Sequence, residues 1–164
     1  MKKKTLLYAA ILIFTGVAVY FLSGSYLFGQ TKDGWLFVRR VTPGFPLKWE
    51  YRHSVMKTHI EEYLAVNEAC DGLILHATKY QSMGVGLPFS EGDGHFRQEG
   101  PWFILDDMER PYPTISLRNG VSNDGVLTVG DTPYRLAELM PLGTELYLYV
   151  APLYKGFWMK KVMH

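Results

Sequence analysis

Six polar side chains of types common in active sites lie within ten residues of the chain. They are His53, Ser54, Lys57, Thr58, Glu61 and Glu62. A serine, a histidine and a carboxylate could form a Ser-His-acid hydrolase. His53 and Ser54, however, are neighbours in an expected strand, so their side chains point to opposite faces. The G-x-S-x-G elbow that presents a nucleophilic serine is also absent. We therefore expect no catalytic residues and no enzyme.

The stretch that carries these residues has the pattern of two strands and a turn. Apolar and polar residues alternate over 47–55 and again over 60–66, which is the period of a β-strand. The short link over 56–58 favours a β-hairpin. A helix over 59–66 is the alternative, because Glu, Leu and Ala are good helix formers.

A hairpin gives these polar residues a structural role. With the turn at 56–58, Arg52 or His53 would lie opposite Glu61 or Glu62, and cross-strand pairing would fix the register. The functional alternative is a recognition surface, made by the hairpin together with a glycine-rich loop, because binding residues concentrate on loops held by a rigid scaffold. The loop residues of this candidate surface are Ser82, Gly84, Gly86, Leu87 and Pro88.

Other motifs are too incomplete to predict a cofactor. The Gly84–Gly86 pattern is followed by neither a helix nor a Gly-Lys-Ser sequence, as a phosphate-binding loop requires. The acidic run at 91–94 lacks the ligand spacing of an EF-hand. The histidines are scattered and Cys70 is the single cysteine, which excludes an intramolecular disulfide and argues against zinc. We expect no cofactor and no metal.

Charge and composition narrow the class of protein further. The 164 residues carry a formal net charge of +1, and three of the 17 basic residues are the lysines at 2–4. No basic run follows them, so nucleic-acid binding has no electrostatic support. A hydrophobic content of 48% is enough for a packed domain.

The N-terminal segment predicts a membrane anchor. No charged residue occurs over 5–31, and the strongly apolar part covers 6–22 and continues through 26–28. A helix of about 20 apolar residues spans a bilayer, and lysines before it keep the N-terminus in the cytoplasm. We expect lipid contact through residues 6–28, with Tyr26 and Phe28 near the far interface. A cleaved signal peptide is the alternative, although no A-x-A site follows.

The remainder predicts an extracytoplasmic β-domain over residues 31–164, after an anchor region over residues 1–30. Glycine and proline recur at short intervals, which favours short strands. The expected fold is all-β, a small antiparallel β-sandwich or barrel behind one transmembrane helix. Besides the hairpin, strands are expected at 34–40, 73–81, 101–105, 114–118, 126–129, 134–136 and 144–151, with a long loop over 82–100 and a helical turn within 137–142.

Two motifs resemble one known family. The run Y-R-H-S-V-M-K-T-H-I-E-E-Y at 51–63 and the run Y-Q-S-M-G-V-G-L-P at 80–88 are similar to a bacterial and archaeal domain-of-unknown-function family, number 1850, over roughly residues 34–154. Met56 departs from the acidic residue expected there. The resemblance implies a small extracytoplasmic domain associated with TRAP transporters of the TAXI subclass. It therefore implies an accessory role in solute uptake, with a transporter membrane subunit or solute-binding subunit as partner. A domain that binds a small ligand or a cation is the alternative function.

Overall fold

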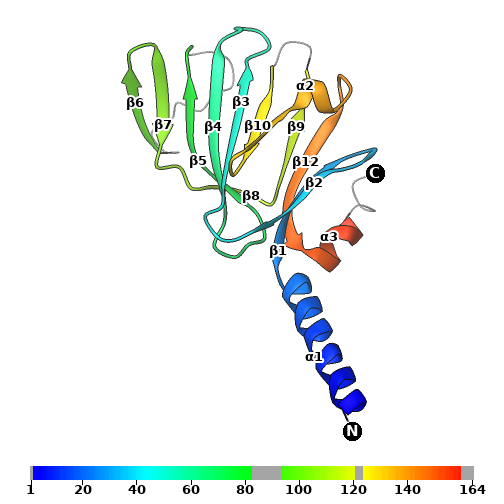
Figure 1. Cartoon of the computed structure of the whole chain (residues 1–164). Helices are drawn as coiled ribbons and strands as arrows, with labels where there is room; N and C mark the ends of the chain where they lie inside the picture. Colours follow the sequence, from blue (N-terminus) through cyan, green and yellow to red (C-terminus); the bar gives the residue numbers. More distant parts are fainter. Residues whose placement is uncertain (1, 83–93, 121–123, 160–164) are drawn as a thin grey trace.

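A computed structural model describes residues 2–82, 94–120 and 124–159. A long N-terminal helix, α1 (Lys2–Leu22), projects from a body made mostly of β-strands (Figure 1). The strands form two antiparallel sheets in a sandwich-like arrangement. Two short helices, α2 (Leu136–Leu139) and α3 (Leu153–Met159), complete the described structure.

The larger sheet has eight strands. Seven follow the order β11-β10-β3-β4-β5-β7-β6, and β8 pairs with the end of β5. Their bounds are β3 (Pro46–Arg52), β4 (His59–Val66), β5 (Leu73–Tyr80), β6 (His95–Glu99), β7 (Trp102–Asp106), β8 (Arg110–Tyr112), β10 (Val126–Val129) and β11 (Thr132–Arg135). The central strands β3, β4 and β5 are consecutive in the chain, as expected for a meander with short turns.

The smaller sheet has four strands in the order β2-β1-β12-β9. They are β1 (Ser25–Thr31), β2 (Gly34–Val41), β9 (Thr114–Arg118) and β12 (Glu145–Pro152). Strands from both ends of the chain therefore pair in this sheet, and β9 forms one of its edges. Alternate side chains of the two sheets meet in a common core, which includes Leu27 and Val150 from the smaller sheet and Leu47, Leu64 and Leu127 from the larger.

The outer face of the smaller sheet is also buried. Phe28 and Tyr149 stack there with their ring centroids 5.0 Å apart. Helix α3 covers them, and Gly156 faces the edge of the Phe28 ring. The Tyr149 hydroxyl lies 2.8 Å from Gln30 Oε1 and 3.2 Å from the Gly156 carbonyl oxygen. The smaller sheet is thus covered by the larger sheet on one face and by α3 on the other.

The predicted fold is confirmed in its main features. The chain is mostly β with two antiparallel sheets, and the stretch over 46–66 is a hairpin rather than a strand and a helix. The strands expected after residue 30 are present, most with ends shifted by one or two residues.

Three expectations about local structure are wrong. Tyr26 and Phe28 do not continue the N-terminal helix; they belong to β1, where alternating side chains enter the core on one face and the α3 contact on the other. Part of the loop expected over 82–100 is the strand β6. The first strand of the hairpin ends at Arg52, so His53 to Val55 belong to the turn.

Helix α1 makes little contact with the body of the domain. Ser23 Oγ donates to the Val19 carbonyl oxygen at 2.7 Å, and the Tyr26 hydroxyl donates to the Phe21 carbonyl oxygen at 3.0 Å. Among the residues whose side chains are described, no helical stretch meets the length and hydropathy of a membrane span. The side chains of α1 that are described are nevertheless largely apolar and exposed.

Substitution Gly156→Ala is expected to destabilise the domain. A Cβ at this position would collide with the fully buried ring of Phe28, which cannot move without disturbing its stack on Tyr149. Such overpacking costs about 1–3 kcal/mol, measurable by urea unfolding. Lys155→Ala, at an exposed position of the same helix, is the control. Equal stability of the two variants would show that α3 does not pack on β1 in solution.

Candidate functional site

The β3–β4 hairpin carries two sets of polar residues, one on each face. Glu61 lies opposite Glu50 in the hairpin, and Glu62 lies opposite Trp49. Because successive side chains alternate between faces, Glu61 points to the outer face of the larger sheet and Glu62 points to the inner face. The two glutamates therefore occupy different environments although they are adjacent in sequence.

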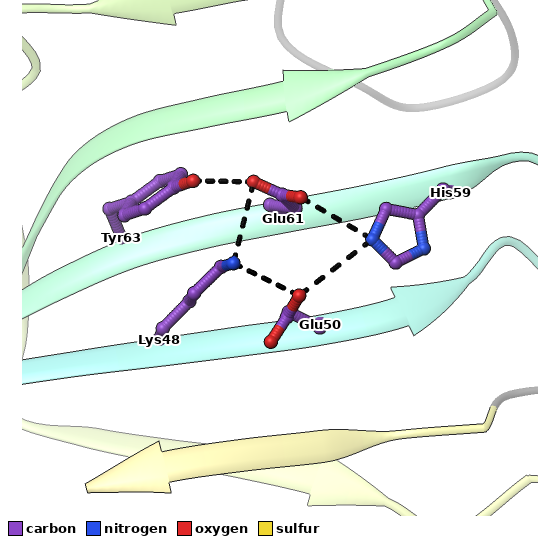
Figure 2. Close-up of polar contacts among 5 residues, drawn as sticks. All are labelled: Lys48, Glu50, His59, Glu61 and Tyr63. Atoms are coloured by element: carbon purple, nitrogen blue, oxygen red, sulfur yellow. Dashed lines mark hydrogen bonds and ion pairs between the residues drawn. The ribbon is translucent and has the colours of Figure 1, made fainter. Parts of the chain in front are cut away.

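The outer face holds what we call the Glu61 cluster, which Figure 2 shows spread over both strands. The Lys48 ammonium lies 2.9 Å from Glu50 Oε1 and 3.7 Å from Glu61 Oε2. His59 Nε2 lies 3.5 Å from Glu61 Oε1 and 3.9 Å from Glu50 Oε1. The Tyr63 hydroxyl donates to Glu61 Oε2. Two carboxylates that would repel each other directly across the strands are thus bridged by a lysine at one end and a histidine at the other.

The electrostatics of the Glu61 cluster favour the ionised carboxylate. Burial opposes ionisation of Glu61, but the Tyr63 hydrogen bond and the positive charges of Lys48 and Lys79, with a further contribution from His59, outweigh it. Together they hold the pKa of Glu61 below its ordinary value. Burial and the Glu61 contact conversely raise the pKa of Tyr63.

The same cluster offers ligands for a metal ion. Glu50, His59 and Glu61 bring one donor atom each within 4.8 Å of one another. The Lys48 ammonium, however, already contacts both carboxylates. A divalent cation would have to displace that ammonium, so the geometry describes an ion-pair network that fixes the register of the hairpin.

The inner face holds a cavity of about 250 Å³ between the two sheets, which we call the Glu62 cavity. Glu62 projects into it from β4. Trp49 and Tyr51 line it from β3, and their rings stack at 5.6 Å between centroids. Tyr112 of β8 lines it as well. The cavity thus combines one carboxyl group with three aromatic rings.

Burial raises the pKa of Glu62, and the Tyr51 hydrogen bond only partly offsets this effect. That bond is long, with the Tyr51 hydroxyl 3.4 Å from Glu62 Oε1. Burial and the nearby carboxylate also raise the pKa of Tyr51. Within the described residues no lysine or arginine is ion-paired with Glu62, in contrast to Glu61.

His53 has a structural role in the turn rather than a place beside the glutamates. The His53 backbone exchanges hydrogen bonds with the turn: its N–H donates to Thr58 O, and its carbonyl accepts from Lys57 N, both at 2.9 Å. The imidazole Nδ1 accepts the N–H groups of Val55 and Met56 at 3.3 and 3.2 Å. The expected pairing of His53 or Arg52 with Glu61 or Glu62 is therefore wrong.

The structure separates the other predicted site residues. Ser54, Lys57 and Thr58 lie in the turn, and Lys57 has a positive φ of 57°. Ser82 follows β5 in a bend and is half-buried. The remaining loop positions, Gly84, Gly86, Leu87 and Pro88, lie outside the described residues. Arg52, the other expected partner of the glutamates, is within 3.6 Å of Asp124.

Sequence analysis missed several residues of both sites: Lys48, Glu50, His59 and Tyr63 of the Glu61 cluster, and Trp49, Tyr51 and Tyr112 of the cavity. A signal existed for Lys48, Glu50 and Tyr63, because they alternate with the apolar positions of the same two strands, whereas Tyr51 belongs to the apolar series itself. The expected turn was too short, and this error changed the predicted pairing of the two strands. Glu61 pairs with Glu50, three residues earlier than the expected His53, because the histidine-capped turn begins at residue 53.

These observations define a small antiparallel β-sandwich domain with an ion-pair cluster outside and a carboxyl-bearing cavity inside. A family model described as a domain of unknown function (DUF1850) matches residues 47–136, which is more than half of the chain. The protein therefore belongs to the DUF1850 family, and the expected family resemblance is confirmed. The matched range runs from Leu47, in the first strand of the hairpin, to Leu136, the first residue of α2. No curated protein and no solved structure matches the chain.

The adjacent glutamates are expected to affect stability with opposite dependence on pH. Because the folded-state pKa of Glu61 is lowered, its stabilisation is complete above the unfolded-state pKa and is lost as the pH falls through the folded one. Glu61→Gln should therefore cost about 1 kcal/mol at pH 7, and the cost should disappear in acid.

For Glu62 the contribution to stability changes with pH in the opposite direction. Its folded-state pKa is raised, so the wild-type protein loses stability as the pH rises through that pKa. Glu62→Gln should match the wild type near pH 4 and exceed it by about 1 kcal/mol at pH 8. Urea unfolding of both variants across this range checks the pair, with exposed Glu68→Gln as the control. Parallel pH profiles for the two variants would contradict the assignment of the glutamates to different faces.

Proposed function

We propose that this protein is a membrane-anchored, extracytoplasmic accessory module that contacts a TAXI-type TRAP transporter, through its membrane subunit or its solute-binding subunit. The exposed apolar surface of α1 is the observation that supports a membrane anchor. Its described large apolar side chains are exposed around the whole helix, from Leu6 at 76% to Leu22 at 48%. A helix that is apolar on all sides requires a protein core or a lipid bilayer around it. The 21 residues of α1 give a length of about 30 Å, comparable to the hydrocarbon thickness of a bilayer.

The connection between α1 and the sandwich supports a position directly at the membrane surface. Only Ser23 and Gly24 separate α1 from β1. The Arg40 guanidinium of β2 lies 3.7 Å from the centroid of the Tyr20 ring, near the end of α1. Tyr154 and Trp158 are exposed on α3, which contacts α1. Aromatic and basic side chains of this kind favour the membrane–water interface.

The turn of the β3–β4 hairpin is our candidate for the contact with the transporter. It lies at the end of the sandwich opposite to α1 (Figure 1), so it would point away from the membrane. Val55 is 70% exposed and Met56 is 43% exposed at its tip, beside the polar residues His53, Ser54 and Lys57. Two exposed apolar side chains on a turn held by hydrogen bonds suit a small protein contact. The family resemblance supports the identity of the partner.

A second candidate function is the binding of a small ligand, and the Glu62 cavity favours it. An enzymatic role has less support; a pocket lined by both His53 and Glu62 would favour it. Glu62 lines the cavity, whereas His53 lies in the turn.

The full chain is expected to remain in the membrane pellet after an alkaline carbonate wash. Mass spectrometry of the purified protein should find an intact N-terminal segment. Leu12→Arg places a charge near the middle of α1, at a cost of about 2.5–3.5 kcal/mol for insertion, and should shift protein to the soluble fraction. Lys155→Ala should leave the distribution unchanged. A wild-type protein that is soluble and begins after residue 22 would establish a cleaved signal peptide instead.

The double substitution Val55→Asp with Met56→Asp is expected to abolish co-purification of transporter subunits from detergent extracts. It removes the apolar tip and adds two charges to a surface that must lose water on contact. Leu142→Asp, at another exposed apolar position with 62% exposure, is the matched control. Recovery of no transporter subunit with the wild-type protein, together with normal solute uptake in a deletion strain, would refute the accessory role.

A further inference from the structure

The Glu62 cavity has the chemical features of a cation-binding site. Its one charged group is a carboxyl, and Trp49, Tyr51 and Tyr112 supply ring surfaces around it. The aliphatic side chains of Leu64 and Leu75 complete the wall on the larger sheet. Aromatic faces attract cations through the negative potential of their π-systems, and the attraction strengthens when water is excluded.

We propose that the Glu62 cavity binds a small free organic ammonium ion, with the Glu62 carboxylate as its counter-ion and the rings of Trp49, Tyr51 and Tyr112 as its walls. This inference does not depend on the membrane anchor or on a transporter partner.

Other ligand classes fit the cavity less well. An anion would be repelled by Glu62, and a Ca²⁺ ion needs six to eight oxygen ligands, which one carboxylate and three aromatic walls do not supply. A neutral apolar molecule would leave the carboxylate with its single long hydrogen bond from Tyr51. The volume of about 250 Å³ is smaller than the usual 300–1,000 Å³ of pockets for drug-sized ligands. The ligand is therefore of the size of choline or a small alkylamine.

A ligand could enter along strand β9. This strand is an edge of the smaller sheet. Its residues form the wall of the cavity that lies opposite the larger sheet. Ser116 is exposed and Ile115 is only half-buried, although both line the cavity. The wall at this edge thus borders solvent, whereas Trp49 and Leu64 on the opposite wall are buried.

Binding is coupled to the protonation of Glu62. Burial raises the pKa of this carboxyl, and a bound cation restores the ionised form and releases a proton. The affinity therefore rises with pH through the pKa of Glu62 and reaches a plateau above it. The other titratable groups that face the cavity are Tyr51 from β3 and Tyr112 from β8. The pKa of Tyr51 is raised by burial and by the Glu62 carboxylate, so Tyr51 stays protonated while Glu62 titrates.

Isothermal titration calorimetry of the full chain tests the proposal. The protein is kept in dodecyl maltoside, which carries no ammonium group. Choline and its uncharged isostere, 3,3-dimethylbutan-1-ol, are each titrated into the protein in separate experiments. Choline is expected to bind more tightly by about tenfold or more. Because Glu62 releases a proton on binding, the observed binding enthalpy should differ between buffers of different ionisation enthalpy. Equal affinity for both compounds, or no heat with either, overturns the proposal.

Two variants and one further ligand locate the site. Glu62→Gln should weaken choline binding about tenfold or more and abolish the pH dependence, whereas Glu61→Gln on the opposite face should leave both unchanged. Loss of binding in Glu61→Gln alone would move the site to the outer cluster and overturn the proposal. Glycerophosphocholine should bind more weakly than choline, because its phosphate adds an anion near Glu62. Tighter binding of glycerophosphocholine would identify a lipid headgroup and contradict a free solute.

Discussion

The register of the β3–β4 hairpin determines the chemistry on both faces of the larger sheet. Side chains alternate along a strand, so a shift of one residue would send Glu61 into the cavity and Glu62 out to solvent. The turn that fixes this register depends on His53. Its ring nitrogen accepts two backbone N–H groups, and its backbone closes the turn with Lys57 and Thr58. The histidine thus stabilises a local conformation whose effect extends along both strands.

The charged cluster, which begins next to the turn at His59, stabilises the same register through side chains of both strands. With Glu50 opposite Glu61, the hairpin would place two like charges together, an arrangement that is destabilising in isolation. Lys48 and His59 lie between them, and Tyr63 donates to Glu61 as well. In any other register these residues would not meet. The cluster therefore makes the native pairing more favourable than its alternatives, which is a structural role for its polar residues.

Much of the fold could be predicted from sequence because it depends on local patterns. The alternation from Leu47 onward and the glycine and proline turns identified most strands after residue 30, but not β6 or β8. Strand β1 could not be identified in this way, because Tyr26, Leu27 and Phe28 follow an apolar segment without any polar break. Their apolar character is the same in a bilayer and in a strand buried on both faces. The turn was misplaced because the hydrogen bonds of the His53 side chain have no periodicity. The cavity depends on contacts between β3, β8 and β9, which are distant in sequence.

Glu62 is difficult to explain by stability alone. An apolar residue at this position would continue the series formed by Ile60, Leu64 and Val66 on the inner face of β4. A carboxyl there loses hydration and gains one long hydrogen bond, a net cost that its raised pKa reflects. Proteins tolerate such a cost chiefly where a binding site requires it. Glu61, one residue away, has a lowered pKa because of its neighbouring positive charges and the Tyr63 hydrogen bond. The opposite pKa shifts of the two glutamates therefore reflect the two faces of the sheet on which they lie. Glu62 has the Tyr51 hydrogen bond but no lysine or arginine as an ion-pair partner among the described residues, and this supports the proposal that a cationic ligand supplies the missing positive charge.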